Sequence, residues 1–193
     1  GKGMDGFSVC VDGKTTPACV TTSDGLFTLA GVSYLDDGML KVTKTGYRPL
    51  YVMMGRKQVS SAFAAWVLTD AELKAEAALA KVSPKTGTGN LGIFIIGPSG
   101  GLKDAKVALA KKVGDGPIYY GDNIKPDPAK TSSAKHGHLL WFNIPAGDHE
   151  LIVTPPNSAV VCKPEFARSS TGKNRFKVTI KADGDTYTQV ICK

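Results

Sequence analysis

Two histidines and two tyrosines are the residues of this sequence whose types and spacing could do chemistry. His136 and His138 are separated by one glycine, and Tyr119 and Tyr120 lie shortly before them. Imidazole nitrogens bind zinc, copper, iron and nickel, and a tyrosine oxygen can also be an iron ligand. This grouping therefore raises the hypothesis of a metal site.

The periodicity of the surrounding strands argues against that hypothesis. Side chains alternate between the two faces of a strand, so an inward Leu139 and Trp141 turn His138 outward. His136 lies at the preceding turn, and His149 falls in the inward register of the next strand. We therefore predict no metal and no cofactor. If His136 and His138 bind nickel or zinc, a fortuitous surface site is favoured over a catalytic one.

One glycine-rich segment could indicate nucleophilic catalysis or phosphate binding. Gly97-Pro-Ser-Gly-Gly101 has the spacing Gly-x-Ser-x-Gly, but it lacks the strand–helix context of a nucleophile elbow. The same segment lacks the Gly-Lys-Ser/Thr ending of a phosphate-binding loop. We interpret it as a β-turn and predict that the protein is not an enzyme.

Composition and charge limit the class of protein. The chain has 193 residues and 42% hydrophobic content, which suits one large domain or two small ones. No apolar run reaches about 18 residues, so no membrane-spanning segment is predicted. Gly1-Lys2-Gly3 is typical of a processed or recombinant chain, so a lipid anchor on a precursor stays open. The net charge of +7 forms no block, which favours a solvated surface over nucleic-acid binding.

Four cysteines indicate an oxidising compartment. Cys10 and Cys19 bracket a short loop, whereas Cys162 and Cys192 both lie in the second half. No Cys-x-x-Cys is present, which removes the usual zinc, haem and thioredoxin spacings. Of the three pairings that four cysteines allow, shorter loops favour Cys10–Cys19 with Cys162–Cys192, and four free thiols are the alternative. Disulfides predict a secreted, cell-surface or periplasmic protein.

Alternating apolar residues between glycine- and proline-rich turns predict an all-β chain. The Asp24-Gly25 turn leads into a strand at 26–30, and the segment 121–129 is expected to be a loop. Two strands, 138–144 and 148–154, are expected to form a hairpin around Pro145-Ala-Gly147. The remaining strands are expected at 7–11, 18–22, 39–44, 48–54, 62–68, 91–96, 106–111, 116–120, 160–162, 176–182 and 187–192.

One helix is expected between the strands. Thr69-Asp-Ala-Glu72 is a capping box, and the following residues to Lys81 are good helix formers. Leu73 and Ala77, with Leu79 or Ala78, are expected to face inward. The predicted organisation is a first β-sandwich module at 1–68, a capped helix and linker at 69–90, and a second module at 91–193.

A repeated pattern supports two related modules. Apolar residues recur two, four and seven positions after Gly25 and again after Gly137: Phe27, Leu29 and Val32 in the first copy, and Leu139, Trp141 and Ile144 in the second.

With its following strand and Gly46-Tyr47, this pattern resembles the carboxypeptidase regulatory-like domain, a small transthyretin-like (prealbumin-like) β-sandwich. The resemblance implies two tandem Ig-like or transthyretin-like sandwiches joined by one short α-helix. With the two cysteine pairs, the chain is similar to secreted or lipid-anchored tandem-domain proteins of Gram-negative bacteria.

The resemblance implies an accessory domain and not a peptidase. A zinc carboxypeptidase uses His-x-x-Glu, and no histidine of this chain has glutamate three residues later. Intradiol dioxygenases share a related sandwich, but their histidine pair follows the hairpin that His136-Gly-His138 precedes here.

Two sets of outward residues are candidates for a binding surface. Leu140 and Phe142 would form an apolar patch if contiguous and exposed, although packing in the core or between modules is favoured. Arg175, Lys177 and Lys181 lie on the outward side of a strand and would form a basic stripe. Such a row also keeps an exposed strand soluble.

The sequence thus predicts a non-enzymatic extracellular or cell-envelope module. Its predicted role is protein–protein interaction or surface assembly, with another envelope or extracellular protein or with its own copies. The alternative is a carbohydrate- or small-ligand-binding module, for which polysaccharide is a candidate partner.

Overall fold

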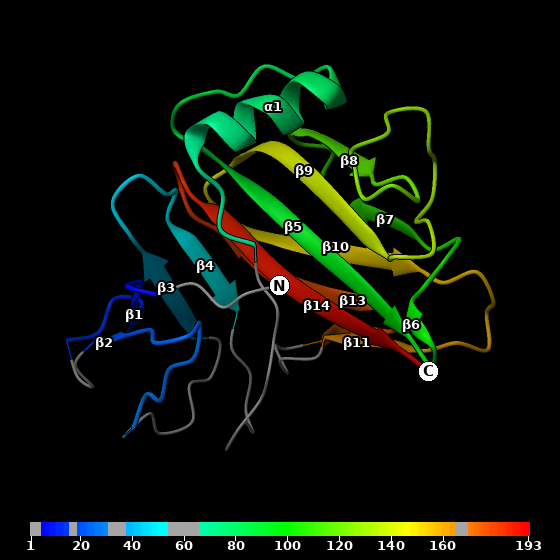
Figure 1. Cartoon of the computed structure of the whole chain (residues 1–193). Coiled ribbons are helices and arrows are strands. Elements are labelled where there is room, and N and C mark those ends of the chain that lie inside the picture. Colours follow the sequence, from blue (N-terminus) through cyan, green and yellow to red (C-terminus); the bar gives the residue numbers. More distant parts are fainter. Residues whose placement is uncertain (1–4, 16–18, 31–37, 54–65, 165–169) are drawn as a thin grey trace.

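A computed structural model describes residues 5–15, 19–30, 38–53, 66–164 and 170–193. These residues are mostly β, with two packed sheets and the helix α1 (Asp70–Ala80) (Figure 1). The strands are β1 (Ser8–Val11), β2 (Val20–Thr21), β3 (Met39–Thr43), β4 (Leu50–Met53), β5 (Thr88–Gly97), β6 (Gly100–Gly101), β7 (Lys106–Leu109), β8 (Asp115–Tyr119), β9 (His138–Pro145), β10 (Gly147–Thr154), β11 (Cys162–Pro164), β12 (Ser170–Gly172), β13 (Arg175–Ile180) and β14 (Asp185–Cys192).

The large sheet runs through both halves of the chain. Its strand order is β2-β1-β3-β4-β14-β5-β9-β8, with β11 also paired to β14 and β6 to β5. The small sheet has the order β12-β13-β10-β7. Among the described residues, strands before α1 lie in the large sheet alone, so the predicted tandem pair of sandwiches is not confirmed. The division at 68 and 90 stays a prediction.

The strand β14 joins the two halves. It pairs in parallel with β4 on one side, where Asp185 lies opposite Leu50, and with β5 on the other, where Asp185 lies opposite Asn90. The Asp185 carboxylate accepts hydrogen bonds from Asn90 Nδ2 at 2.8 Å and Arg48 Nε at 3.1 Å. Arg48 also donates to Asp70 at the start of α1, at 3.0 Å. This network fixes β4, β5, β14 and α1 at one point.

The main core lies between the two sheets. Inward side chains of β5, β9 and β14 pack against those of β7, β10 and β13, as the alternation of Phe176, Val178 and Ile180 predicts. Met39, Tyr51 and Met53 of the first half join the same core. The disulfide Cys162–Cys192 links β11 to β14, and Cys10–Cys19 closes the β1–β2 loop, so the favoured pairing is confirmed.

The opposite face of the large sheet is covered as well. Figure 1 shows α1 lying across β5 and β9. The capping box is confirmed, because Glu72 N–H donates to Thr69 Oγ1 and the Glu72 carboxylate accepts from Thr69 N–H. Leu73, Ala77 and Ala80 are the buried helix residues. Leu79 is 49% exposed and Ala78 is also exposed, so the expectation that one of the two faces inward is wrong.

Three predicted elements differ from the structure. The strands β9 and β10 lie in different sheets, so 138–154 is a crossover and not a hairpin. The pairing with β5 shifts register at Asn143, which has φ 56°, and extends to Pro145, which has no backbone N–H to donate. The Asp24-Gly25 turn is confirmed, but the expected strand at 26–30 contains only a bridge between Ser23 and Leu26.

The expected strand at 62–68 lies partly outside the described residues, and its described part, 66–68, is not a strand.

Replacing Arg48 by methionine tests the central network. Asp185 is 8% exposed, and burial raises its pKa although Asn90 and Arg48 stabilise the carboxylate. Removing the cation leaves this buried charge unpaired, so Arg48→Met should lower the free energy of unfolding by about 3 kcal/mol at pH 7. In this variant, the pKa of Asp185 in the folded state lies further above its value in the unfolded state. The loss of stability should therefore shrink as pH falls from 7 and Asp185 binds a proton.

Urea unfolding at several pH values measures this effect. The control Asp70→Asn removes a carboxylate that is 77% exposed and should cost about 1 kcal/mol or less. A cost for Arg48→Met that is the same at pH 7 and pH 4 would contradict the assignment.

Candidate functional site

Leu140 and Phe142 do not form a surface patch. They point away from the sandwich core as predicted, but α1 covers them, and they are 6% and 0% exposed. Tyr120 holds the helix there by donating from Oη to Glu76 Oε2 at 2.7 Å. The candidate of an exposed apolar patch is therefore wrong, and the two residues pack inside the protein, against α1, in line with the favoured interpretation of packing.

Arg175 and Lys177 of β13, and Lys181 directly after it, each have an acidic partner. Arg175 pairs with Glu150 at 2.6 Å, Lys177 with Asp148 at 2.8 Å, and Lys181 with Asp12 at 2.6 Å. The Arg175 hydrogen bond lowers the Glu150 pKa, so this carboxylate stays charged at neutral pH. The row is thus electrically balanced, and its use as a binding surface stays a prediction.

The histidines lie in separate surroundings. His136 Nε2 lies 3.3 Å from the Asp122 carbonyl oxygen, and His149 Nε2 lies 2.8 Å from that of Pro145. In the described part of the chain, no three His, Cys, Asp or Glu side chains gather closely enough to hold a metal ion.

His138 belongs to an aromatic cluster on the helix side of the large sheet. Its ring stacks on Phe94 and also contacts Trp66, with 4.4 Å between ring centroids in both pairs. Burial, and then the nearby His136, lowers the pKa of His138 to about 4. The His138 Nδ1 atom is buried without a hydrogen-bond partner among the described residues. The neutral ring therefore acts as an aromatic packing element near pH 7.

The long connection from β8 to β9, residues 120–137, is the most elaborate loop that the structure describes. Loops of this length without regular structure are usually functional. Ser133 anchors it, because Ser133 N–H donates to Ala105 O and Ser133 Oγ to Leu102 O. Its tip is closed by hydrogen bonds from Gly121 N to Lys125 O and from Ile124 N to Gly121 O. The predicted loop at 121–129 is confirmed.

Ile124 is held at this tip in an unfavourable backbone conformation. Its φ is 56°, a left-handed value that costs a β-branched residue about 1–2 kcal/mol. The side chain is nevertheless 45% exposed and so gains little burial in return. A strained, exposed apolar residue on an internally hydrogen-bonded loop is a candidate contact residue.

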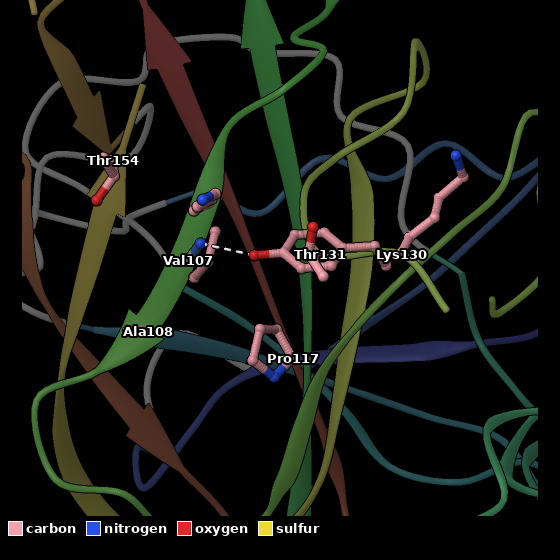
Figure 2. A pocket seen from close by; sticks show the side chains of 8 residues that line it. Val107, Ala108, Pro117, Lys130, Thr131 and Thr154 are labelled. Carbon is pink, nitrogen blue, oxygen red and sulfur yellow. Dashed lines mark hydrogen bonds between the residues drawn. The ribbon is translucent and has the colours of Figure 1, made fainter. Parts of the chain in front are cut away.

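A shallow cavity of about 430 Å³ lies beside the start of this connection (Figure 2). It opens between the edge strand β7 of the small sheet and the edge strand β8 of the large sheet. Figure 2 shows Val107 and Thr154 on one side of it and Thr131 and Lys130 on the other. The lining residues are Lys106, Val107, Ala108, Pro117, Tyr119, Lys130, Thr131 and Thr154.

Sequence reasoning pointed to neither the strained Ile124 nor the cavity between β7 and β8. The Asn123-Ile-Lys-Pro segment reads as an ordinary loop, and a left-handed φ at Ile124 has no signal in the sequence. The cavity combines residues from four separate segments. The unusual length of the segment between 120 and 138 was the one available indication.

Comparisons with known proteins leave the family open. No protein-family model matches the chain, and no curated protein matches it. Solved structures give weak likenesses: a streptococcal ancillary pilin (10% identity, TM-score 0.34), the Bacillus anthracis TIE protein (15%, 0.31) and BcpA, the major pilin subunit of Bacillus cereus (15%, 0.32). These cover 82%, 98% and 98% of this chain, which spans 45%, 31% and 55% of theirs. At such scores they assign neither a family nor a function.

Replacing Ile124 by asparagine should stabilise the protein. Asparagine tolerates the left-handed conformation, so Ile124→Asn should raise the free energy of unfolding by about 1 kcal/mol, measured by urea denaturation. The control Leu79→Asn places the same residue at an exposed helix site and should cost about 0.5 kcal/mol. Destabilisation by Ile124→Asn would show that the isoleucine is not strained.

Replacing His138 by phenylalanine should change the acid stability. The folded-state pKa of about 4 lies below the ordinary 6.5, so the wild type loses stability as pH falls from 6.5 towards 4. The phenyl ring of His138→Phe would keep the aromatic contacts and carry no proton. The variant should therefore equal or exceed wild type at pH 7, by up to about 1 kcal/mol, and its advantage should grow towards pH 4. Thermal unfolding at both pH values provides the measurement, and a constant difference would refute the assignment.

Proposed function

We propose that this protein is a non-enzymatic extracellular or cell-envelope module that mediates protein–protein interaction or surface assembly. The observation that carries the proposal is Ile124, which the 120–137 connection holds exposed and strained. A preformed loop loses little conformational entropy on binding, and an apolar side chain at its tip supplies the buried contact that a protein partner needs.

The disulfides support the compartment. Two disulfides join cysteines on neighbouring strands or at the ends of one loop, as is usual for proteins of oxidising environments. We infer a secreted, cell-surface or periplasmic location, and a lipid anchor on a precursor belongs to the same proposal. Within the described ranges, no helix combines the length and apolar character that crossing a bilayer requires.

Relationship to the carboxypeptidase regulatory-like domain remains part of this proposal. The supporting features are the β-sandwich and the Asp24-Gly25 turn, and the repeated pattern after Gly25 and Gly137 is the sequence argument. A second candidate function, carbohydrate or small-ligand binding, is favoured by the cavity between β7 and β8.

Binding by wild type and two asparagine variants tests the role of the loop. Wild type, Ile124→Asn and Leu79→Asn would each be used to recover partners from native cell envelope, and self-association would be followed by analytical ultracentrifugation. Loss of a central apolar contact should weaken the identified interaction at least tenfold for Ile124→Asn. Leu79→Asn should bind as wild type does.

The expected gain in stability of Ile124→Asn separates lost binding from lost folding. Equal binding by both variants would remove the loop from the interface. A wild type that stays monomeric and recovers no partner beyond those of an unrelated disulfide-bonded sandwich would contradict the proposed function.

A further inference from the structure

The cavity between β7 and β8 contains an unusual set of polar groups. Two lysines, Lys106 and Lys130, and three residues with hydroxyl groups, Tyr119, Thr131 and Thr154, line it. Figure 2 shows the Lys130 side chain extending away from Val107. None of the described residues that line it is an aspartate or a glutamate. Among the described residues, neither lysine has an ion-pair partner, in contrast to Lys177 and Lys181. The site therefore favours a negatively charged ligand.

Tyr119 supplies a second and independent observation. The residue is 2% exposed, and its hydroxyl oxygen accepts a hydrogen bond from Val107 N–H at 2.8 Å. Within the described part of the chain, the hydroxyl hydrogen has no acceptor. Burial raises the Tyr119 pKa, so this hydrogen is retained at neutral pH. A buried donor normally has a partner, and the cavity that Tyr119 lines is where an acceptor atom would lie.

The other residues that line the cavity indicate which chemical groups the rest of the ligand carries. Val107, Ala108 and Pro117 present aliphatic surface, which a bare inorganic anion would not use. The hydroxyl groups of Thr131 and Thr154 can both donate and accept, as a ligand with several hydroxyl groups requires. A volume of about 430 Å³ lies within the range of small-molecule sites and exceeds the needs of a simple ion.

We propose that this cavity binds a uronic acid, a carboxylated sugar residue of an acidic polysaccharide. The carboxylate accepts from Tyr119 Oη–H and is attracted by Lys106 and Lys130, whose flexible side chains can turn towards it. The sugar ring lies against Pro117, and its hydroxyl groups reach the threonine side chains. This inference goes beyond the proposed protein-binding role, because it uses the opening between the two sheets and not the Ile124 loop.

Nuclear magnetic resonance titration of the whole ¹⁵N-labelled chain tests the proposal. The probes are glucuronate, glucose as the uncharged counterpart, acetate as the carboxylate alone, and acetyl-diglycine as a peptide carboxylate. Glucuronate should shift the amide signals around Val107, Thr131 and Thr154 with a dissociation constant on the order of 1 mM. Each other probe should bind at least fivefold more weakly.

Two double variants of equal charge locate the site. Lys106→Gln with Lys130→Gln should weaken glucuronate binding about tenfold, and Lys111→Gln with Lys112→Gln, which removes two exposed lysines outside the lining, should leave it within twofold. Tyr119→Phe should weaken binding about fivefold while the amide spectrum stays folded. Unchanged stability of the two lysine double variants excludes an indirect effect of unfolding.

Several results would overturn the proposal. Equal affinity for glucose or acetyl-diglycine would remove the uronate assignment. Equal weakening by the two lysine double variants would show long-range attraction in place of a site. Undiminished binding by Tyr119→Phe would show that the hydroxyl hydrogen does not contact the ligand. No saturable shift with glucuronate would show that the cavity does not bind a uronate. None of these results depends on Ile124→Asn, so the two proposals fail separately.

Discussion

The parallel pairing of β14 with both β4 and β5 is the constraint on which the rest of the structure depends. β14 is the last strand in chain order. It lies between β4 of the first half and β5 of the second half and so makes one continuous sheet. Arg48 and Asn90 fix its register by meeting at the Asp185 carboxylate. Since β14 contributes to the core between the sheets and to the opposite face, neither layer is complete without it. Such non-local pairing must be formed at a cost in chain entropy before the contacts repay it.

Burial of the large sheet on both faces explains where binding features can occur. The small sheet covers one face, and α1 with the apolar cluster around β1, β3 and β4 covers much of the other. Exposed groups with unused bonding capacity are consequently found at sheet edges and in the β8–β9 connection. The strained Ile124 and the lysine-lined cavity both belong to this region, although they present different chemistry.

Local features of the fold were predictable from the sequence, and non-local ones were not. Thr69 and Glu72 cap the helix within one turn, Asp24-Gly25 makes its own turn, and Cys10 pairs across a short loop. By contrast, the position of β14 and the cover of α1 over Leu140 and Phe142 depend on residues far apart in the chain. Alternation placed Leu140 on the outer face correctly, but it cannot show what lies over that face. The strain at Ile124 and the convergence around Tyr119 are likewise invisible to pattern and spacing.

The contact between Tyr119 and Val107 has a consequence for the solubility of the folded protein. The small sheet ends at β7, and an unpaired strand edge is a template for the addition of strands from other molecules. Tyr119 Oη occupies the Val107 N–H, which is one of the groups that an added strand would need. Lys106 adds a charged side chain to the same edge. One phenol group from the opposite sheet thus protects the end of the sandwich against edge-to-edge aggregation.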